Sequence, residues 1–386
     1  MRHSLFIIIL LTLFLFFPSN VFAVENPLAV PNNKVGVHIL FPGEIKDAAK
    51  LVNSNGGDWG YVTVPIQTND RDLNKWQTFM DNAKTLHVIP ILRLATEGDF
   101  YNTTVWRKPT IFDLLDFATF LNQLSWPTKN RYLIVFNEPN RADEWGGKPN
   151  PSEYAYILQD AITIFKQKSD DFFIISAGLD NAAVTTGDGT SYTWDDFMTK
   201  MHDGAPDLFS HIDGLGSHSY PNPAFGKDPE VDDPMSIKTY TYEQQLIASF
   251  GATLLPVFIT ETGWSQAALS NTTIAQYFTR AFTNKWTDAN IVAITPFLLR
   301  AYTPPFHVFS LLAEGDQTTP QYTAIADVPK IAGEPLIASP SATMSAVLAQ
   351  ESVIHINKPV SQQNFDVARW LQNLFNPVVQ AFTHLL

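Results

Sequence analysis

The chain has 386 residues, a formal net charge of −13 and no cysteine. The acidic balance argues against nucleic acid or an anionic membrane as the main partner, and the lack of cysteine excludes disulfides, thiolate metal sites and a cysteine nucleophile. With 45% hydrophobic and 13% aromatic residues, the chain can build one large core instead.

The N-terminus has the pattern of a signal peptide over residues 1–23. A charged start precedes an apolar run over residues 5–17, and a small residue, Ala23, ends the segment. This run is too short to span a bilayer, and no later stretch is long and uncharged enough, so we expect no transmembrane helix in the mature chain. The pattern predicts a protein that is secreted, or held at the cell surface or in the periplasm, once residues 1–23 are removed.

Apolar, β-branched runs recur along residues 24–330, with helix-like segments between them. Eight such runs begin near Lys34, Gly60, His87, Tyr132, Phe172, Ile212, Val257 and Ile291. Their starts lie 26 to 45 residues apart, which fits one strand, a crossover helix and loops. Apolar residues recur at helical spacing in residues 72–86, 111–124, 151–167 and 272–286. The pattern predicts an α/β fold, a (β/α)8 TIM barrel, over residues 24–330.

The pattern changes after residue 330. Residues 331–365 are rich in alanine, serine and proline without a clear period, which predicts a linker or irregular segment. Residues 366–386 have apolar side chains at helical spacing, which predicts an amphipathic C-terminal helix. We expect this helix to dock on the barrel or on a partner subunit. Attachment to a membrane surface is the alternative, and it is less favoured because Arg369 is the only formally cationic side chain of the segment.

Two of the predicted strands end in a glutamate. Leu133-Ile134-Val135-Phe136-Asn137-Glu138-Pro139 closes the fourth run, and Val257-Phe258-Ile259-Thr260-Glu261-Thr262-Gly263-Trp264 closes the seventh. A carboxylate after an apolar run is costly to desolvate, so the two cases call for a common reason. The tips of strands four and seven lie across the barrel mouth from each other, where Glu138 and Glu261 could converge on one sugar. A separation of about 5–5.5 Å would indicate cleavage with retention, and about 6.5–9.5 Å cleavage with inversion.

With these two motifs on strands four and seven, the chain resembles the clan of retaining glycoside hydrolases built on (β/α)8 barrels, which includes cellulase-like and β-xylosidase-like members. The resemblance covers about residues 35–328. It implies that Glu138 is the acid/base, Glu261 the nucleophile and Asn137 the hydrogen-bond partner of the sugar 2-hydroxyl. The implied activity is hydrolysis of O-glycosidic bonds in a β-linked poly- or oligosaccharide by double displacement.

Other strand tips offer further substrate-binding candidates. His218 and Tyr220 follow the sixth run, where many clan members place a residue that contacts the nucleophile or the substrate, and Tyr220 could donate to Glu261. Cellulase-like members have an arginine on strand two, which this chain lacks. We expect Arg93, at the tip of strand three, to reach the nucleophile in its place; the alternative is a structural salt bridge. His38, at the first tip, is either a ligand or a core histidine.

Aromatic side chains can stack on the C–H face of a sugar ring. Trp264, directly after Glu261, and Trp145, in the loop after strand four, are the best placed. Phe297, on strand eight, is the next candidate, at a position where many clan members have a tryptophan. Trp106 is one of the tryptophans that we assign to packing. We expect the aromatic rings to surround Glu138 and raise its proton affinity, while Arg93 or Tyr220 keeps Glu261 ionised.

No other motif predicts a cofactor. The nine histidines include no H-E-x-x-H cluster, and residues 180–188 lack the ligand spacing of a calcium loop, so we predict no metal and no cofactor. Two alternatives to hydrolysis stay open. One is a non-catalytic carbohydrate-binding barrel at the cell surface, and the other is a transglycosylase, in which a second sugar intercepts the covalent intermediate. The shape of the rim loops decides the sugar, the linkage and whether cleavage is internal or terminal.

Overall fold

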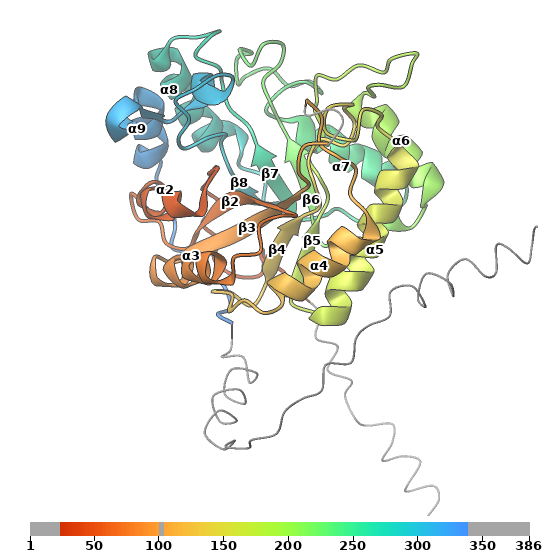
Figure 1. The fold of residues 1–386 in the computed structure, drawn as a ribbon. Coiled ribbons are helices and arrows are strands. Elements are labelled where there is room, and N and C mark those ends of the chain that lie inside the picture. The colour runs from red at the N-terminus through yellow and green to blue at the C-terminus, as the bar shows by residue number, and fades with distance from the viewer. Residues whose placement is uncertain (1–23, 100–103, 339–386) are drawn as a thin grey trace, which may run out of the picture. The chain divides into compact units, whose positions relative to one another are not determined.

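The computed structural model describes residues 24–99 and 104–338, in which eight parallel strands alternate with helices (Figure 1). The strands are β1 (Gly36–His38), β2 (Gly60–Gln67), β3 (Val88–Ala95), β4 (Arg131–Ile134), β5 (Phe172–Ile175), β6 (Leu215–His218), β7 (Val257–Glu261) and β8 (Ile291–Ile294). Each strand overlaps one of the eight predicted apolar runs. The predicted (β/α)8 TIM barrel is therefore confirmed.

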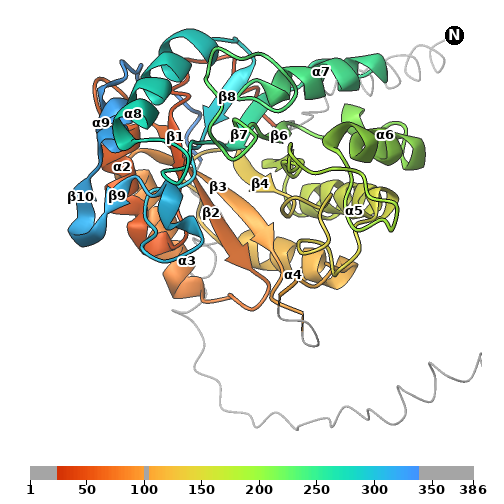
Figure 2. The same ribbon diagram turned by 90° about the horizontal axis from the view of Figure 1, so that it is seen from above.

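The eight strands close into a barrel through two isolated bridges. β1 to β5 form one parallel sheet and β6 to β8 another. Val35 pairs with Ile294 to join the β1 and β8 edges, and Ile175 pairs with Gly214 to join the β5 and β6 edges. Seen from above, the helices lie outside the strands (Figure 2). All eight strands therefore end at the same face of the barrel, where enzymes of this fold build their sites.

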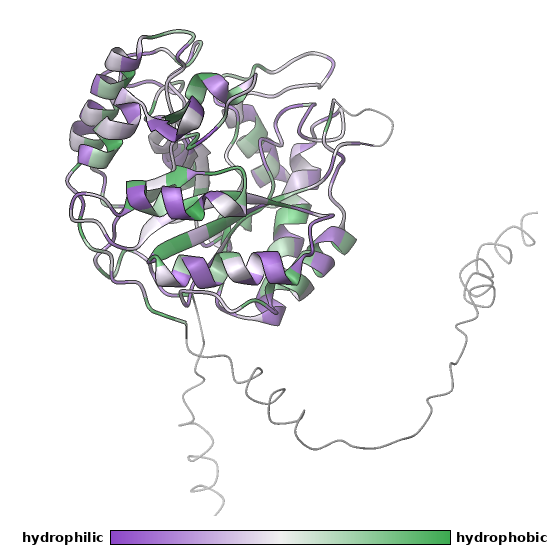
Figure 3. Ribbon diagram, turned by 60° about the vertical axis from the view of Figure 1, so that its left-hand side comes forward, coloured by the Kyte–Doolittle hydropathy of each residue, from purple (hydrophilic) through white to green (hydrophobic). Residues whose placement is uncertain are grey.

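The strands are apolar on both faces because each face packs against a different core. Inside the barrel a cluster of alternate strand residues includes Tyr61, Tyr132, Phe173 and Phe258, and the Tyr132 ring lies 4.9 Å from Phe173 and 5.5 Å from Phe258. A larger cluster lies between the strands and the surrounding helices. In Figure 3 the strands are largely hydrophobic, whereas the helices mix hydrophobic and hydrophilic faces. This is the pattern expected of a parallel sheet covered by amphipathic helices.

The helices include all four predicted segments and four more. They are α2 (Ile45–Val52), α3 (Leu73–Thr85), α4 (Ile111–Leu121), α5 (Pro151–Lys168), α6 (Trp194–Gly204), α7 (Thr239–Ser249), α8 (Asn271–Arg280) and α9 (Pro320–Asp327). Shorter elements are η1 (Pro42–Glu44), η2 (Leu208–Ser210), η3 (Ala281–Lys285), η4 (Phe306–Phe309), η5 (Glu314–Asp316) and the hairpin of β9 (Leu312–Ala313) with β10 (Gln317–Thr318). None of the helices within residues 24–99 and 104–338 has both the length and the apolar character that a membrane span requires.

Residues 331–338, the described part of the predicted linker, cross the N-terminal ends of the strands. Ala332 bridges Asp58 just before β2, and Ile337 bridges Thr128 just before β4. This stretch therefore packs on the barrel. The chain divides into two units, residues 1–339 and 340–386. The predicted signal peptide, the rest of the linker and the predicted C-terminal helix lie outside the described residues.

Candidate active site

Two strand tips carry the glutamates of the predicted pair. Glu261 is the last residue of β7, whereas Glu138 follows β4 after a tight turn in which Phe136 and Glu138 have positive φ angles of 69° and 31°. Positive φ is unfavourable for side chains of this size and occurs where the surrounding structure holds it. Here the Glu138 amide donates to the carbonyl of Gly178 at 3.2 Å. The turn directs the Glu138 carboxylate toward the barrel mouth instead of into the sheet.

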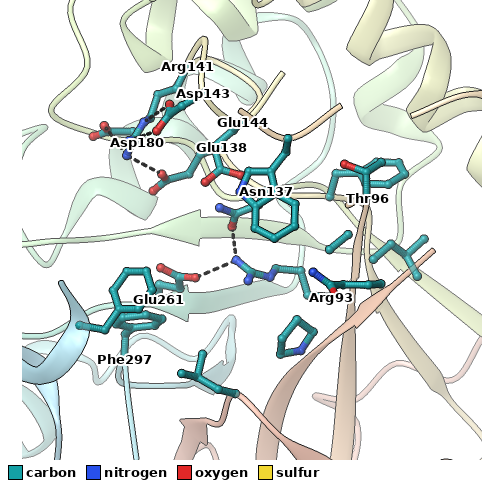
Figure 4. Close-up of a pocket in the computed structure, with 18 of the residues that line it drawn as sticks. Arg93, Thr96, Asn137, Glu138, Arg141, Asp143, Glu144, Asp180, Glu261 and Phe297 are labelled. Carbon is teal, nitrogen blue, oxygen red and sulfur yellow. Dashed lines mark hydrogen bonds and ion pairs between the residues drawn. The ribbon is translucent and has the colours of Figure 1, made fainter. Parts of the chain in front are cut away.

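The structure brings the two carboxylates together. One oxygen of Glu138 and one of Glu261 lie within 4.8 Å of each other, and the two residues are only 8% and 7% exposed. Both line a cavity of about 780 Å³ at the carboxyl ends of the strands (Figure 4). Two facing carboxylates at such a distance are a candidate acid/base and nucleophile pair.

Glu261 accepts hydrogen bonds from two other strand tips and has a third, His38, close by. Its Oε1 accepts from the Arg93 guanidinium at 3.1 Å, its Oε2 accepts from the Tyr220 hydroxyl at 3.0 Å, and His38 Nε2 lies 3.7 Å from Oε1. The same Arg93 nitrogen donates to Asn137 Oδ1 at 2.5 Å. Arg93 and Tyr220 thus lie where the sequence predicts. Because β2 carries no arginine, Arg93 of β3 is the cation beside Glu261.

The neutral groups beside Glu261 keep their protonation state over a wide pH range. Burial, with the nearby charges of Glu261 and Glu138, raises the pKa of Tyr220 well above its ordinary value. Burial, with Arg93 and His218, lowers the pKa of His38 well below its ordinary value. His38 is fully buried and does not line the cavity, so it is a core histidine against the nucleophile candidate, and the ligand alternative is wrong. Arg93 therefore supplies the permanent charge on this side.

Glu138 has polar partners, which corrects the expected ring of aromatic side chains. His218 Nδ1 lies 2.7 Å from its Oε1 and Arg141 donates to its Oε2 at 3.0 Å, while the same His218 nitrogen is 3.9 Å from Glu261. His218 is buried behind the carboxylates and does not line the cavity, so it contacts Glu138 and not the substrate. A side chain at Gly178 would lie 2.1 Å from the His218 ring, so this glycine allows the ring to reach Glu138.

Four polar residues of the β4 and β5 loops line the cavity although the sequence does not predict it: Arg141, Asp143, Glu144 and Asp180. Arg141, which donates to Glu138, also forms ion pairs with Asp143 at 2.6 Å and with Asp180 at 3.5 Å (Figure 4). The only signal in the sequence is the run Arg141 to Glu144 directly after the Asn137-Glu138 motif. A charged run in a loop is ordinarily solvated, and only the folding of these loops over the cavity turns it inward.

Three groups near Glu138 have raised pKa values. Burial lowers the pKa of His218, but the Glu261 and Glu138 carboxylates more than offset this, and the pKa is raised. Burial and the Glu138 charge raise the pKa of Asp180, and the same two causes raise the pKa of Glu144 to about 7. The carboxylate at Glu138 therefore sits among groups that can exchange protons.

The predicted tryptophan platforms are wrong. Trp264 is 2% exposed, packs on Phe278 and Trp286, and does not line the cavity. Trp145 backs the cavity wall but is fully buried, and its indole N–H donates to Glu153. A ring with no exposed face cannot stack on a sugar.

Other aromatic rings line the cavity instead. Trp106, which the sequence assigns to packing, is partly exposed there, because Gly98 and Trp106 pair and turn the β3 loop toward the site. Phe297 lines the cavity as expected, 5.1 Å from the His38 ring, and Phe306 packs on it with 44% of its own surface exposed. Among the described residues, Trp106, Phe306 and Phe41, which is 68% exposed, are the rings with open surface in the cavity, while Phe297 is buried beneath Phe306.

Glu138, His218 and Glu261 each offer one donor atom, and the three atoms lie within 4.8 Å of one another, a spacing that could hold a metal ion. However, Glu261 already has Arg93 at 3.1 Å and Glu138 has Arg141 at 3.0 Å. A divalent cation between the carboxylates would face both guanidinium groups. The donor set fits proton transfer better than metal binding.

Comparison with known proteins identifies the family of this chain. Residues 100–320, more than half of the chain, match the family model described as glycosyl hydrolase catalytic core. No curated protein matches the sequence. Among solved structures, a family 39 glycoside hydrolase from Bacteroides cellulosilyticus is 18% identical, with a TM-score of 0.53 over 78% of this chain and 64% of that one.

Two further solved structures share the fold over a larger part of their own length. A GH128 (subgroup II) endo-β-1,3-glucanase from Pseudomonas viridiflava is 16% identical, with a TM-score of 0.50 over 77% of this chain and 98% of that one. A GH5_18 protein from Bifidobacterium longum subsp. infantis is 15% identical, with a TM-score of 0.53 over 78% and 81%. At these identities the likeness shows the barrel fold.

Proposed function

This chain belongs to the glycosyl hydrolase catalytic core family, and we propose that it hydrolyses a β-linked glycan with retention of configuration. The observation that carries the proposal is the approach of the Glu138 and Glu261 oxygens to within 4.8 Å. Retaining glycosidases have carboxyl groups about 5–5.5 Å apart, and inverting ones need about 6.5–9.5 Å to admit a water molecule between carboxylate and sugar. A closest oxygen–oxygen approach within 4.8 Å is nearer to the retaining spacing than to the inverting one.

Glu261 acts as the nucleophile and Glu138 as the acid/base. Glu261 attacks the anomeric carbon as Glu138 gives its proton to the leaving oxygen, so the C–O bond breaks and a glycosyl ester forms on Glu261. Glu138 then takes a proton from a water molecule, which attacks the same carbon and releases Glu261 as a carboxylate. Arg93 and Tyr220 donate to the Glu261 carboxylate at 3.1 and 3.0 Å and hold it in place.

The substrate is a neutral glycan. Among residues 24–99 and 104–338, the charged side chains that line the cavity comprise six carboxylates and three cations. Each of the cations is paired with a lining carboxylate: Lys75 with Asp70, Arg93 with Glu261, and Arg141 with Glu138. A uronic acid or sulfated sugar would meet net negative charge here and would lack a free cation. The Pseudomonas viridiflava relative is named an endo-β-1,3-glucanase, so β-1,3-glucan is the first polymer to test.

The test is release of reducing sugar from laminarin, mannan, xylan and polygalacturonate, followed by ¹H NMR of the first product formed. We expect turnover of a neutral polymer, none of polygalacturonate, and a β-anomer as the initial product. An α-anomer would overturn retention, and the absence of turnover on every polymer, with a folded protein, would favour the binding-barrel alternative.

We also propose that the protein is exported, on the strength of the signal-peptide pattern in residues 1–23. In a secreting host we expect the protein in the medium, with Val24 as its first residue by N-terminal sequencing. An intracellular protein that retains residues 1–23 would contradict export.

A further inference from the structure

The guanidinium group of Arg141 is divided among three carboxylates, and the double-displacement steps give it no role. Arg141 Nε and Nη2 donate to the two oxygens of Asp143 at 3.0 and 2.6 Å. The remaining nitrogen, Nη1, lies 3.0 Å from Glu138 Oε2 and 3.5 Å from Asp180 Oδ2. All four side chains line the cavity (Figure 4). Glu138 and Asp180 therefore share one nitrogen of Arg141.

The rest of Arg141 is held in place, so Nη1 is the part that can change partner. Its backbone amide donates to the Glu138 carbonyl at 3.0 Å, and its backbone pairs with Ser191 of the β5 loop. The two bonds to Asp143 fix one edge of the planar guanidinium group, which keeps its charge at every working pH. Because Nη1 already lies within 3.5 Å of both other carboxylates, a small rotation is enough to strengthen either contact.

Other charged and titratable groups also face Glu138 from the surrounding strands. They are Arg93 of β3, Asp143 and Glu144 of the β4 loop, Asp180 of the β5 loop, His218 and Tyr220 of β6 and its loop, and Glu261 of β7. His218 Nδ1, at 2.7 Å, is close enough that Glu138 and His218 titrate as a coupled pair. The ion pair of Glu138 with a permanent cation is the one with Arg141.

The charges of Glu138 and Asp180 influence each other through the shared nitrogen. Burial and the Glu138 charge raise the pKa of Asp180, whereas the Ala182 amide and Arg141 lower it. When Glu138 takes up a proton, it no longer repels the Asp180 carboxylate, which then attracts Nη1 more strongly than Glu138 does. When Glu138 gives up its proton, its carboxylate competes for Nη1 again. The 3.0 Å contact with Glu138 matches this second arrangement.

We propose that Arg141 is a positioning residue that turns Nη1 from Asp180 to Glu138 as Glu138 loses its proton, and back as Glu138 regains it, so that one carboxyl group serves first as acid and then as base. This assignment rests on the proposed function. In the first step Glu138 passes its proton to the leaving oxygen, and Nη1 stabilises the carboxylate that remains. In the second step Glu138 takes a proton from water, and Nη1 returns to Asp180.

The test compares pH profiles of four proteins. They are the wild type, Arg141→Gln, Asp180→Asn and, as a control, Asp195→Asn, which neutralises an exposed carboxylate at the start of α6. Asp180→Asn keeps the side-chain oxygen that accepts from the Ala182 amide at 2.8 Å, so the local turn is preserved. Each profile is read relative to the variant's own plateau, so a smaller folded fraction does not move it.

Two substrates report the two steps separately. The first is whichever of laminarin, mannan and xylan the wild type hydrolyses fastest, and its kcat/KM falls on the alkaline side where Glu138 loses the proton that the leaving oxygen needs. The second is the 2,4-dinitrophenyl β-glycoside of the matching disaccharide. Its leaving group needs little protonation, so the second step limits kcat, which falls on the acid side where Glu138 is no longer a base.

We expect both limbs to move to higher pH by about one pH unit in Arg141→Gln, because loss of a neighbouring cation favours the protonated carboxyl group. In Asp180→Asn both limbs should move to lower pH, because Nη1 then belongs to Glu138 alone and a like charge has gone. Asp195→Asn should match the wild type in both profiles.

Limbs that stay in place in Arg141→Gln while the plateaus fall would overturn the assignment, because they would show that Arg141 only shapes the loop. A shift in the same direction in Arg141→Gln and Asp180→Asn would overturn it as well, since the two carboxylates would then not compete for Nη1. Turnover by the wild type tests the proposed function separately, and its absence on every substrate would remove both.

Discussion

The two sides of the carboxylate pair differ in how their partners hold protons. Beside Glu261 are a permanent cation, Arg93, a phenol that stays protonated, Tyr220, and a histidine that stays neutral, His38. Nearer to Glu138 is His218, 2.7 Å from Glu138 and 3.9 Å from Glu261, whose pKa the two carboxylates raise, and burial with the Glu138 charge raises the pKa of Glu144 to about 7. Tyr220 and His38 therefore keep their neutral forms beside Glu261, whereas the groups nearer to Glu138 have raised pKa values.

This difference favours one of the two possible assignments of roles. A nucleophile must be a carboxylate throughout the reaction, and a fixed surrounding of donors suits it. An acid/base must give and take a proton in each cycle, so it belongs among groups that titrate. The contrast supports Glu261 as nucleophile and Glu138 as acid/base.

The contrast predicts its largest effect at Glu261. Glu261→Gln removes the attacking oxygen and keeps the shape, so we expect kcat to fall by about 10⁴-fold or more on every substrate, as for other covalent catalysts. Activity is measured by reducing-sugar release and folding by thermal unfolding. Substantial activity in the variant would show that Glu261 is not the nucleophile.

Glu138→Gln should behave differently, because protonation matters only for poor leaving groups. We expect a loss of about 10²- to 10⁴-fold on a polysaccharide. The first step on a 2,4-dinitrophenyl glycoside, seen as a burst of dinitrophenol, should be nearly unchanged. If both kinds of substrate lose the same factor, Glu138 is not the acid.

Glu243 on α7 is a further buried carboxyl group with a raised pKa. Burial raises its pKa to about 7 from an ordinary 4.5, and its Oε2 has no hydrogen-bond partner among the described residues. The folded-state pKa exceeds the unfolded one, so the stability that its proton contributes is complete below pH 4.5 and is lost as pH rises through about 7. The total is about 3 kcal/mol.

Glu243→Gln should remove this loss. In urea unfolding at pH 5 and pH 8, the variant should gain about 3 kcal/mol relative to the wild type at the higher pH, while Asp195→Asn should show no such change. An equal difference between variant and wild type at both pH values would show that Glu243 does not titrate in this window.

Tyr220→Phe should have the smallest effect of these changes. It deletes the 3.0 Å hydrogen bond to Glu261 but leaves Arg93, so we expect kcat to fall about 10- to 100-fold. Steady-state kinetics give the ratio, and a Tyr192→Phe variant, in a loop away from the pair, is the control. A loss as large as that of Glu261→Gln would mean that Tyr220 has a role of its own in the chemistry.

The barrel and the core of the site could be predicted from local patterns. Apolar runs mark the eight strands, because a parallel strand buried on both faces has few polar positions. Since strand tips meet at one face, residues at the tips also follow: Glu138, Glu261, Asn137, Arg93 and Tyr220 all lie together around one cavity. Strand order brings these tips together, and the turn after β4 directs Glu138 toward the others.

The sequence by itself determined the strand order and hence which polar side chains reach the barrel mouth. Only the tertiary structure decided what lies beside them, because loop residues have no period that ties them to a face. Trp264 turns into the core, Trp106 turns out of its predicted packing role, and His218 reaches Glu138 past Gly178. Glu144 lines the cavity only because the β4 loop folds back over it. Strand tips are positioned by backbone hydrogen bonds that repeat along the sheet, whereas loop side chains are positioned by contacts that exist only once the barrel has closed.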